Sequence, residues 1–226
     1  MVFIKICGIT NLEDALAATR AGADALGFNF YLRSPRFITP GAARSIIEKL
    51  PKRVLTVGVF VNEDGPAEVE RMASAAGVSA VQLHGDESPD FCRALKSRFV
   101  IKALRVRDDF APESALEYNA DAILLDAFAQ NARGGTGRVF DWTLAMRTGR
   151  LIPKLFLAGG LTVENVSEAI NAARPYAVDA CSGIESAPGR KDALRLRAFI
   201  KAARETMSTE MSEWRNHQRS MIKDEG

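Results

Sequence analysis

The sequence predicts an α/β protein built as a single-domain, parallel, eight-stranded (β/α)8 TIM barrel. Short apolar, β-branched runs alternate strictly with stretches of helical length along the whole 226-residue chain. The apolar runs are continuous rather than alternating, which is typical of parallel strands buried on both faces. Eight repeats fit a compact barrel, which needs about 200 residues or more. An open, doubly wound sheet is the other fold that strict alternation allows.

The expected strands are runs of about five residues each, ordered along the chain. They are Phe3–Cys7, Asp24–Phe28, Val54–Phe60, Ala80–His84, Val100–Ala103, Ala122–Asp126, Lys154–Ala158 and Ala177–Cys181. A helix is expected after each strand. These helices are Leu12–Arg20, Pro40–Leu50, Pro66–Ala76, Pro89–Ser97, Pro112–Tyr118, Asp141–Thr148, Val163–Ala173 and Asp192–Thr206.

Capping signals support several of these boundaries. Thr10 lies three positions before Glu13, which is the spacing of a capping box at a helix start. Thr39 and Ser88 each precede a proline, so a capping hydroxyl is followed by the residue best suited to the first helical position. Helix ends carry residues that tolerate a left-handed backbone, namely Gly22, Gly77 and Asn119.

Composition indicates a globular chain without a break into further domains. Hydrophobic residues make up 47% and charged residues 26%, which is close to the average for globular proteins and excludes a disordered or collagen-like chain. We expect residues 1–206 to form the catalytic barrel domain. Residues 207–226 exceed what the barrel needs and are expected to form a C-terminal helical or disordered extension, with a self-association helix as the alternative.

Charge and cysteine usage limit the expected partners. The net charge is only +2 and the charged residues are scattered, so no nucleic-acid partner is expected. No apolar run reaches the ~20 residues of a membrane span, and no signal peptide is recognised. The three cysteines show no C-x-x-C spacing, which favours a reducing, cytoplasmic compartment. We expect no metal and no cofactor, and either a monomer or a homodimer.

Barrel enzymes place their active sites at the carboxyl ends of the strands. The residues at these ends are more polar and richer in glycine than those at the other end, which indicates an enzyme. Cys7 ends the first expected strand and Asp126 ends the sixth. A thiol and a carboxyl that face one ligand can move protons at two positions, so both are candidate catalytic residues. The alternatives are a small buried cysteine and an aspartate that caps a loop.

Two glycine-rich loops are candidate phosphate sites, because closely spaced backbone amides and helix N-termini attract anions. One holds Gly159 and Gly160 after the seventh strand, and the other holds Ser182 and Gly183 after the eighth. Loops at these two places form the usual phosphate site of a barrel. Ordinary turn glycines are the alternative.

Three further features could belong to a binding site. Arg36 lies on the long loop after the second strand and could clamp a carboxylate or phosphate, or simply be solvated. His84 is either a substrate contact or a histidine of the core or a loop. The segment 133–137 is rich in glycine and could act as a closing lid.

Taken together, these motifs resemble the phosphoribosylanthranilate isomerase family of tryptophan biosynthesis. The resemblance runs in order through all the βα units, from residue 3 to about residue 205. The motifs are Lys5-Ile6-Cys7-Gly8-Ile9-Thr10, Ser34-Pro35-Arg36, Val57-Gly58-Val59-Phe60, Gln82-Leu83-His84-Gly85-Asp86-Glu87, Leu124-Leu125-Asp126, Gly134-Gly135-Thr136-Gly137, Leu157-Ala158-Gly159-Gly160-Leu161 and, along the last loop, Ser182-Gly183-Ile184-Glu185 with Pro188, Gly189, Lys191 and Asp192.

The resemblance implies an Amadori rearrangement, an aldose–ketose shift that needs proton transfers and no redox cofactor. Asp126 is then the general acid that opens the sugar ring, and Cys7 is the general base that removes the C2 proton. Arg36 is expected to hold the anthranilate carboxylate of the small phosphoribosyl substrate. The other expected contacts are His84 and Asp179 to the substrate, and the amides near Gly159, Gly160, Ser182 and Gly183 to the phosphate.

One residue departs from the family pattern, and two other functions stay open. The family commonly has serine where this chain has Cys181, which is harmless if the contact there is through the backbone but weakens phosphate binding if a hydroxyl makes it. The first alternative function is the isomerase of the histidine pathway, whose family has aspartate at the position of Cys7, although some enzymes of this fold accept both substrates. The second is a non-catalytic barrel that binds a phosphorylated metabolite.

Overall fold

The computed structural model describes residues 1–95, 97–106, 109–126 and 142–206. Its strands form a closed barrel in the order β1 to β8, and each neighbouring pair is parallel. The strands are β1 (Phe3–Ile6), β2 (Ala25–Asn29), β3 (Leu55–Phe60), β4 (Ala80–Leu83), β5 (Phe99–Arg105), β6 (Ala122–Asp126), β7 (Leu155–Ala158) and β8 (Ala177–Ala180). The predicted barrel is therefore confirmed, and the open sheet is excluded.

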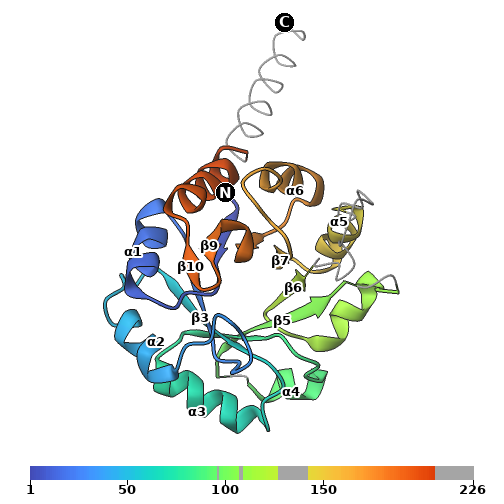
Figure 1. The fold of residues 1–226 in the computed structure, drawn as a ribbon. Coiled ribbons are helices and arrows are strands. Elements are labelled where there is room, and N and C mark those ends of the chain that lie inside the picture. The colour runs from blue at the N-terminus through green and yellow to red at the C-terminus, as the bar shows by residue number, and fades with distance from the viewer. Residues whose placement is uncertain (96, 107–108, 127–141, 207–226) are drawn as a thin grey trace, which may run out of the picture.

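Helices surround the barrel, as the view along its axis shows (Figure 1). They are α1 (Leu12–Ala21), α2 (Pro40–Ile47), α3 (Pro66–Ala76), α4 (Pro89–Ala94), α5 (Trp142–Leu151), α6 (Val166–Ala173) and a final helix over residues 193–206. Between β5 and β6 the sequence predicted an α-helix, but η1 (Pro112–Tyr118) is a 3-10 helix. After β8 the chain forms a short 3-10 turn, η2 (Ser182–Ile184), and a hairpin of β9 (Glu185–Ala187) and β10 (Arg190–Lys191), which the sequence did not predict.

The helix boundaries follow the capping chemistry with one correction. Thr39 and Ser88 cap α2 and α4 as expected, because each side chain accepts a hydrogen bond from a backbone amide three residues on. The cap of α1 is Asn11 rather than Thr10, since the Asn11 side chain accepts from Asp14 N. Thr10 instead donates its hydroxyl to Gly189 O at 2.5 Å and so ties the loop after β1 to the hairpin. The residues with the expected left-handed backbone at helix ends are Gly22, Gly77 and Asn119.

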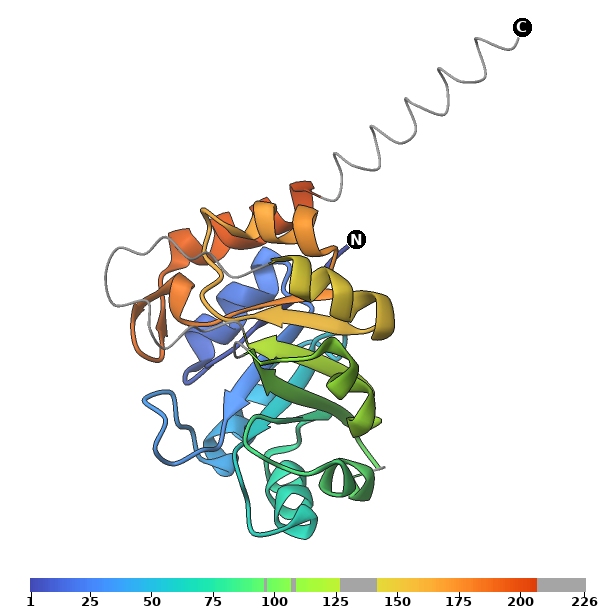
Figure 2. The same cartoon turned by 90° about the vertical axis from the view of Figure 1, so that its right-hand side faces the viewer.

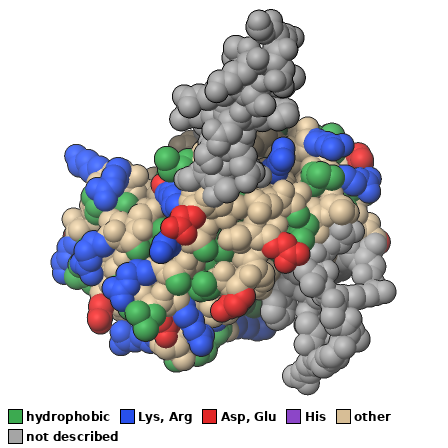
Figure 3. Space-filling view, turned by 90° about the horizontal axis from the view of Figure 1, so that it is seen from above, with side chains coloured by type: hydrophobic (Ala, Val, Ile, Leu, Met, Phe, Trp, Pro, Cys, Tyr) green, Lys and Arg blue, Asp and Glu red, His purple; other side chains and the backbone are tan. Residues whose placement is uncertain are grey.

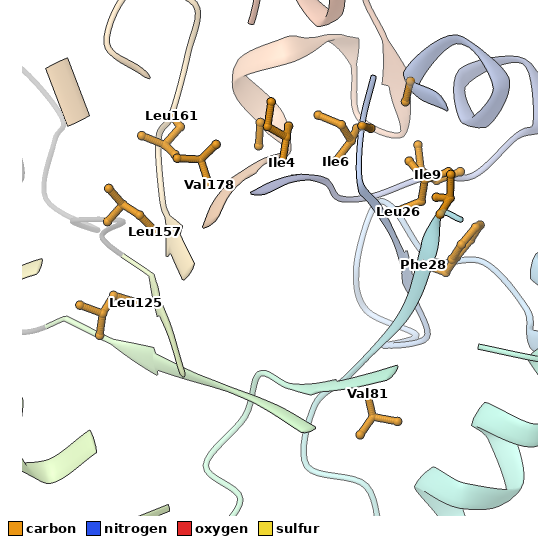
Figure 4. Packing of buried hydrophobic residues seen from close by; sticks show 14 of the residues in the cluster. Ile4, Ile6, Ile9, Leu26, Phe28, Val81, Leu125, Leu157, Leu161 and Val178 are labelled. Carbon is orange, nitrogen blue, oxygen red and sulfur yellow. The ribbon is translucent and has the colours of Figure 1, made fainter. Parts of the chain in front are cut away.

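Two layers of apolar side chains make up the core. Alternate residues of the strands fill the barrel interior, and this inner cluster contains Ala25, Val57, Ala80, Ile101, Ala103, Ala122, Leu124, Phe156, Ala158 and Ala177. The remaining strand residues point outward and pack against the helices. Figure 4 shows part of this outer layer, including Ile4, Leu26, Val81 and Leu125. Burial on both faces explains why the strands read as continuous apolar runs.

The barrel is closed by the pairing of β1 with β8, in which Lys5 lies opposite Asp179 and Ile6 opposite Ala180. The final helix reinforces this closure. Arg204 donates to Val2 O at 2.7 Å, to Gly22 O at 2.9 Å and to Asp24 Oδ2 at 2.7 Å. The end of the described chain is thus fastened to its beginning on the amino-terminal side of the barrel. In Figure 2 the N terminus lies on the right, while the loop after β2 and the β9–β10 hairpin project on the left.

The surface carries charges of both signs. On the face shown in Figure 3, Lys and Arg side chains are interspersed with Asp and Glu. Among the described residues, no helix is long and apolar enough to cross a membrane. The expected lid at 133–137 and the expected extension at 207–226 both lie outside the described residues.

The inner cluster generates a test of the core. Phe156 is 1% exposed inside the barrel, so Phe156→Ala should lower the free energy of unfolding by about 3–5 kcal/mol. The matched control is Leu194→Ala on the final helix, where the leucine is 73% exposed and the change should stay within about 0.5 kcal/mol. Urea unfolding followed by circular dichroism measures both. Equal losses would contradict the assignment of the barrel interior as a core.

Candidate active site

The candidate catalytic and binding side chains meet at the carboxyl end of the barrel. Cys7 directly follows β1, His84 follows β4, and Asp126 ends β6. Arg36 lies on the loop after β2, and Asp179 is within β8. The structure therefore places these residues at the end of the barrel where the sequence predicts the site.

The Cys7 thiol lies in a buried, positively charged environment. Cys7 is 9% exposed. Hydrogen bonding with the Cys181 thiol, together with the nearby Lys5 and Lys191 ammonium groups, lowers the pKa of the Cys7 thiol well below its ordinary value, although burial opposes the shift. A Cβ at Gly27 would lie 2.7 Å from Cys7 Sγ and 3.2 Å from Lys5 Nζ. Only glycine at this position of β2 leaves room for both groups.

A buried ion pair lies next to Cys7, because Lys5 precedes Cys7 by two residues and faces the barrel interior as Cys7 does. Lys5 Nζ donates to Asp179 Oδ2 at 2.7 Å, and both side chains are buried. Burial alone would lower the pKa of Lys5, but the adjacent Asp179 and Cys7 raise it, so the ammonium stays charged. Burial raises the pKa of Asp179 to about 7, while Lys5 counteracts this rise. Asp179 Oδ1 is buried and has no hydrogen-bond partner among the described residues.

The Asp126 carboxyl is held by a histidine. His84 Nε2 lies 3.1 Å from Asp126 Oδ2, and Gln82 Nε2 lies 2.7 Å from His84 Nδ1. When the Gln82 amide donates to Nδ1, the imidazole carries its proton on Nε2 and donates it to Asp126. Both His84 and Asp126 remain about one quarter exposed, so a ligand in the mouth can reach them. His84 is thus fixed against the candidate acid.

Arg36 is fixed at the mouth by a carboxylate rather than solvated. Its Nε lies 2.9 Å and its Nη2 2.6 Å from oxygens of Glu185. Glu185 also accepts from Lys191 Nζ at 2.9 Å and from Gly189 N at 3.3 Å. Burial would raise the pKa of Glu185, but the hydrogen bonds from Arg36 and Lys191 lower it, so Glu185 is a charged anchor.

Gly8 allows this arginine to lie close to the thiols. A Cβ at Gly8 would lie 2.7 Å from Arg36 Cδ and 2.9 Å from Cys181 Sγ. Its φ of +76° is also in the left-handed region that favours glycine. The guanidinium stem therefore passes directly over the turn that follows Cys7.

The two candidate phosphate loops pack against each other. Gly159 and Gly160 have φ values of 85° and 70°, so the turn after β7 uses the left-handed backbone. A Cβ at Gly183 would collide with the Leu161 carbonyl oxygen. Ser182 begins the 3-10 turn η2, directly beside this contact. The loops after β7 and β8 thus form one continuous surface at the mouth.

Four polar residues of this site carry no role in the sequence prediction: Lys5, Gln82, Glu185 and Lys191. Lys5 and Gln82 each lie two positions before a candidate site residue, and the period of two in a strand puts both pairs on the inner face. That spacing could have identified them. Glu185 and Lys191 are brought to the site by the hairpin, and both belong to the last motif of the resemblance. Among the residues that the structure describes, no group of three or more His, Cys, Asp or Glu is arranged to hold a metal.

Comparison with known proteins places the chain in a family. The family model described as N-(5'phosphoribosyl)anthranilate (PRA) isomerase matches residues 4–202. An N-(5'-phosphoribosyl)anthranilate isomerase of Pelobacter propionicus is 52% identical over 208 residues, which cover 92% of this chain and 98% of the relative.

Two solved structures extend the match to the fold. A phosphoribosyl anthranilate isomerase in complex with reduced 1-(o-carboxyphenylamino)-1-deoxyribulose 5-phosphate is 46% identical, with a TM-score of 0.82 over 91% of this chain and 100% of that one. Monomers of the dimeric enzyme of Thermotoga maritima are 45% identical, with a TM-score of 0.81 over 91% of this chain and 100% of that one. The chain belongs to the N-(5'-phosphoribosyl)anthranilate isomerase family.

Proposed function

We propose that the chain converts N-(5'-phosphoribosyl)anthranilate to 1-(2-carboxyphenylamino)-1-deoxyribulose 5-phosphate, the isomerisation of tryptophan biosynthesis. The observation that carries this proposal is the arrangement of a low-pKa thiol, Cys7, and a histidine-bound carboxyl, Asp126, at one barrel mouth. Family membership supports the substrate, since a related structure holds a reduced form of this product.

Asp126 acts first, as the general acid. It donates a proton to the ring oxygen of the ribose, the bond between C1 and that oxygen breaks, and the nitrogen lone pair forms an iminium. The hydrogen bond from His84 at 3.1 Å fixes the orientation of the carboxyl for this transfer.

Cys7 acts second, as the general base. Its thiolate removes the proton from C2, and the electrons of that bond form the C1–C2 double bond of an enolamine while the nitrogen becomes neutral. Tautomerisation to the ketone completes the reaction. A thiol can do this at neutral pH only if a sufficient fraction is ionised, and the lowered pKa of Cys7 meets this requirement.

Charged groups and amides around the mouth bind the two anionic ends of the substrate. Arg36, anchored by Glu185, holds the anthranilate carboxylate. Asp179 Oδ1, which has no partner within the described part of the chain, is an acceptor for a substrate hydroxyl. The backbone amides near Gly159, Gly160, Ser182 and Gly183 hold the phosphate. A cytoplasmic location belongs to the proposal, because a reducing compartment keeps Cys7 a free thiol.

The decisive test is the fluorescence of phosphoribosylanthranilate, generated in situ from anthranilate, which is lost on isomerisation. We expect rapid decay with the wild type, and rates reduced by about 10²–10⁴-fold for Cys7→Ser and Asp126→Asn, the usual effect of losing a general base or acid. Cys92→Ala is the matched control and should keep its activity, because Cys92 lies buried in α4.

Two outcomes would count against the proposal. An unchanged rate in either site variant would refute the role assigned to that residue. A folded wild type that leaves the emission unchanged but isomerises the phosphoribosyl amine of the histidine pathway would move the substrate to that alternative.

The Arg36–Glu185 contact predicts separate effects on binding and turnover. Arg36→Ala removes a charge-assisted hydrogen-bond partner of the substrate, so KM should rise by about 10–100-fold while kcat changes little. Glu185→Gln keeps the shape but loses the charge that orients Arg36, so KM should rise by a smaller factor. Steady-state kinetics separates the two constants. A fall in kcat alone for Arg36→Ala would exclude the carboxylate clamp.

The environment of Cys7 predicts a pH dependence. The base must be a thiolate, so kcat/KM falls as the pH drops through the pKa of Cys7. Cys181→Ala removes the hydrogen bond that lowers this pKa most, so the pKa should rise and the acidic limb of the profile should move to higher pH. At alkaline pH the two proteins should converge. Superimposed acidic limbs would show that Cys181 does not influence the base.

A further inference from the structure

We propose that Cys7 and Cys181 form an oxidative modification site, at which hydrogen peroxide converts the two thiols into an intramolecular disulfide. The inference goes beyond the proposed function, because formation of the bond does not depend on the reaction that the chain catalyses. The loss of activity that follows does rest on the proposed role of Cys7 as the base.

The strand register brings the two cysteines together. Ile6 is paired with Ala180 across β1 and β8, and Cys7 N donates to Ala180 O at 2.8 Å. The next residues on the two strands are Cys7 and Cys181. Neighbouring strands lie about 4.8 Å apart, which is within the roughly 4.4–6.8 Å between the Cα atoms of a disulfide. Because the two cysteines follow a directly paired position, the disulfide needs little movement of the backbone.

The charges around the pair favour Cys7 as the thiol that reacts first. Lys5, Lys191 and the hydrogen bond from Cys181 all stabilise the Cys7 thiolate, which is the form that attacks a peroxide. Cys181 lies at the mouth and is more exposed than Cys7, so it is the resolving thiol. The small size of hydrogen peroxide suits the limited access to Cys7, which is 9% exposed.

The chemistry balances in two steps. The Cys7 thiolate attacks one oxygen of the peroxide, the O–O bond breaks, and hydroxide leaves, so that Cys7 becomes a sulfenic acid. The Cys181 sulfur then attacks Cys7 Sγ, the S–O bond breaks, and the departing hydroxide takes the Cys181 proton as water. The two sulfurs together lose two electrons, the peroxide is reduced, and with the uptake of one further proton two water molecules form.

The second step becomes easier once the first has occurred. The pKa of the Cys181 thiol is raised mainly by its hydrogen bond to the Cys7 thiolate, and also by burial and by the charge of Cys7. Conversion of Cys7 to a neutral sulfenic acid removes this negative charge. The Lys191 and Arg36 cations, which lower the pKa of Cys181, then act without that opposition. Ionisation of the resolving thiol is therefore coupled to oxidation of the first one.

The third cysteine provides a matched control. Cys92 lies in α4, within the outer layer of the core, and is 4% exposed. Burial raises the pKa of its thiol, so it is a poor nucleophile. It should remain reduced while the other two react.

The test exposes the reduced, full-length chain to hydrogen peroxide, alkylates the remaining thiols, and maps the peptides by mass spectrometry. The wild type and Cys92→Ala should yield a peptide that links Cys7 to Cys181, with the chain two hydrogen atoms lighter. Dithiothreitol should restore the free thiols and any isomerase activity lost with them. In Cys181→Ser the sulfenic acid cannot be resolved, so Cys7 should oxidise on to sulfinic acid, which dithiothreitol does not reverse.

Two results would overturn the inference. In the first, Cys7 of the wild type becomes oxidised but no peptide linking it to Cys181 is found. In the second, dithiothreitol restores the free Cys7 thiol of the Cys181→Ser variant as fully as that of the wild type. Both are read from peptide masses, so they decide the inference even if the proposed isomerase activity is not observed.

Discussion

The pairing of β1 with β8 is the contact on which the rest of the molecule depends. It closes the barrel, and it joins Lys5 to Asp179, which are 174 positions apart in the chain. The same register places Cys7 beside Cys181 at the mouth. The hairpin that follows β8 then carries Glu185 and Lys191 over this pair. Closure of the barrel and assembly of the site are therefore one event.

Two buried ion pairs, Lys5–Asp179 and Lys191–Glu185, lie close to the closure. A buried ion pair is weak evidence for stability, because desolvation offsets much of the attraction. The Lys5–Asp179 and Lys191–Glu185 pairs lie against the thiols, where they set the charge around the proposed base. A third buried pair, Lys102–Glu87, joins β5 to the loop after β4, and its carboxylate accepts from backbone amides of Asn62 and Gly85. This pair holds loops, so burial of charge alone does not mark a catalytic group.

The sequence predicted the fold well because its strongest signals are local. Continuous apolar runs and helix caps such as Thr39 each involve only a few neighbouring residues, and their repetition along the chain predicts the barrel. Cys7 and Asp126 were identifiable because each stands at the end of an apolar strand. The contacts between Arg36 and Glu185, and between Cys7 and Cys181, join distant parts of the chain and follow from the closure. Their partners could be read only from the three-dimensional arrangement.

The contact of Cys181 with Cys7 has two consequences. Hydrogen bonding from the Cys181 thiol stabilises the Cys7 thiolate, as a serine hydroxyl at this position could also do. Only a thiol can also form a covalent bond with that neighbour, so Cys181 serves both the proposed base and its proposed oxidation. The glycines at positions 8 and 27 keep both sulfurs packed closely, because a side chain at either position would displace one of them. The site is therefore suited to conditions that keep thiols reduced, and its reactivity and its sensitivity to oxidants have the same physical origin.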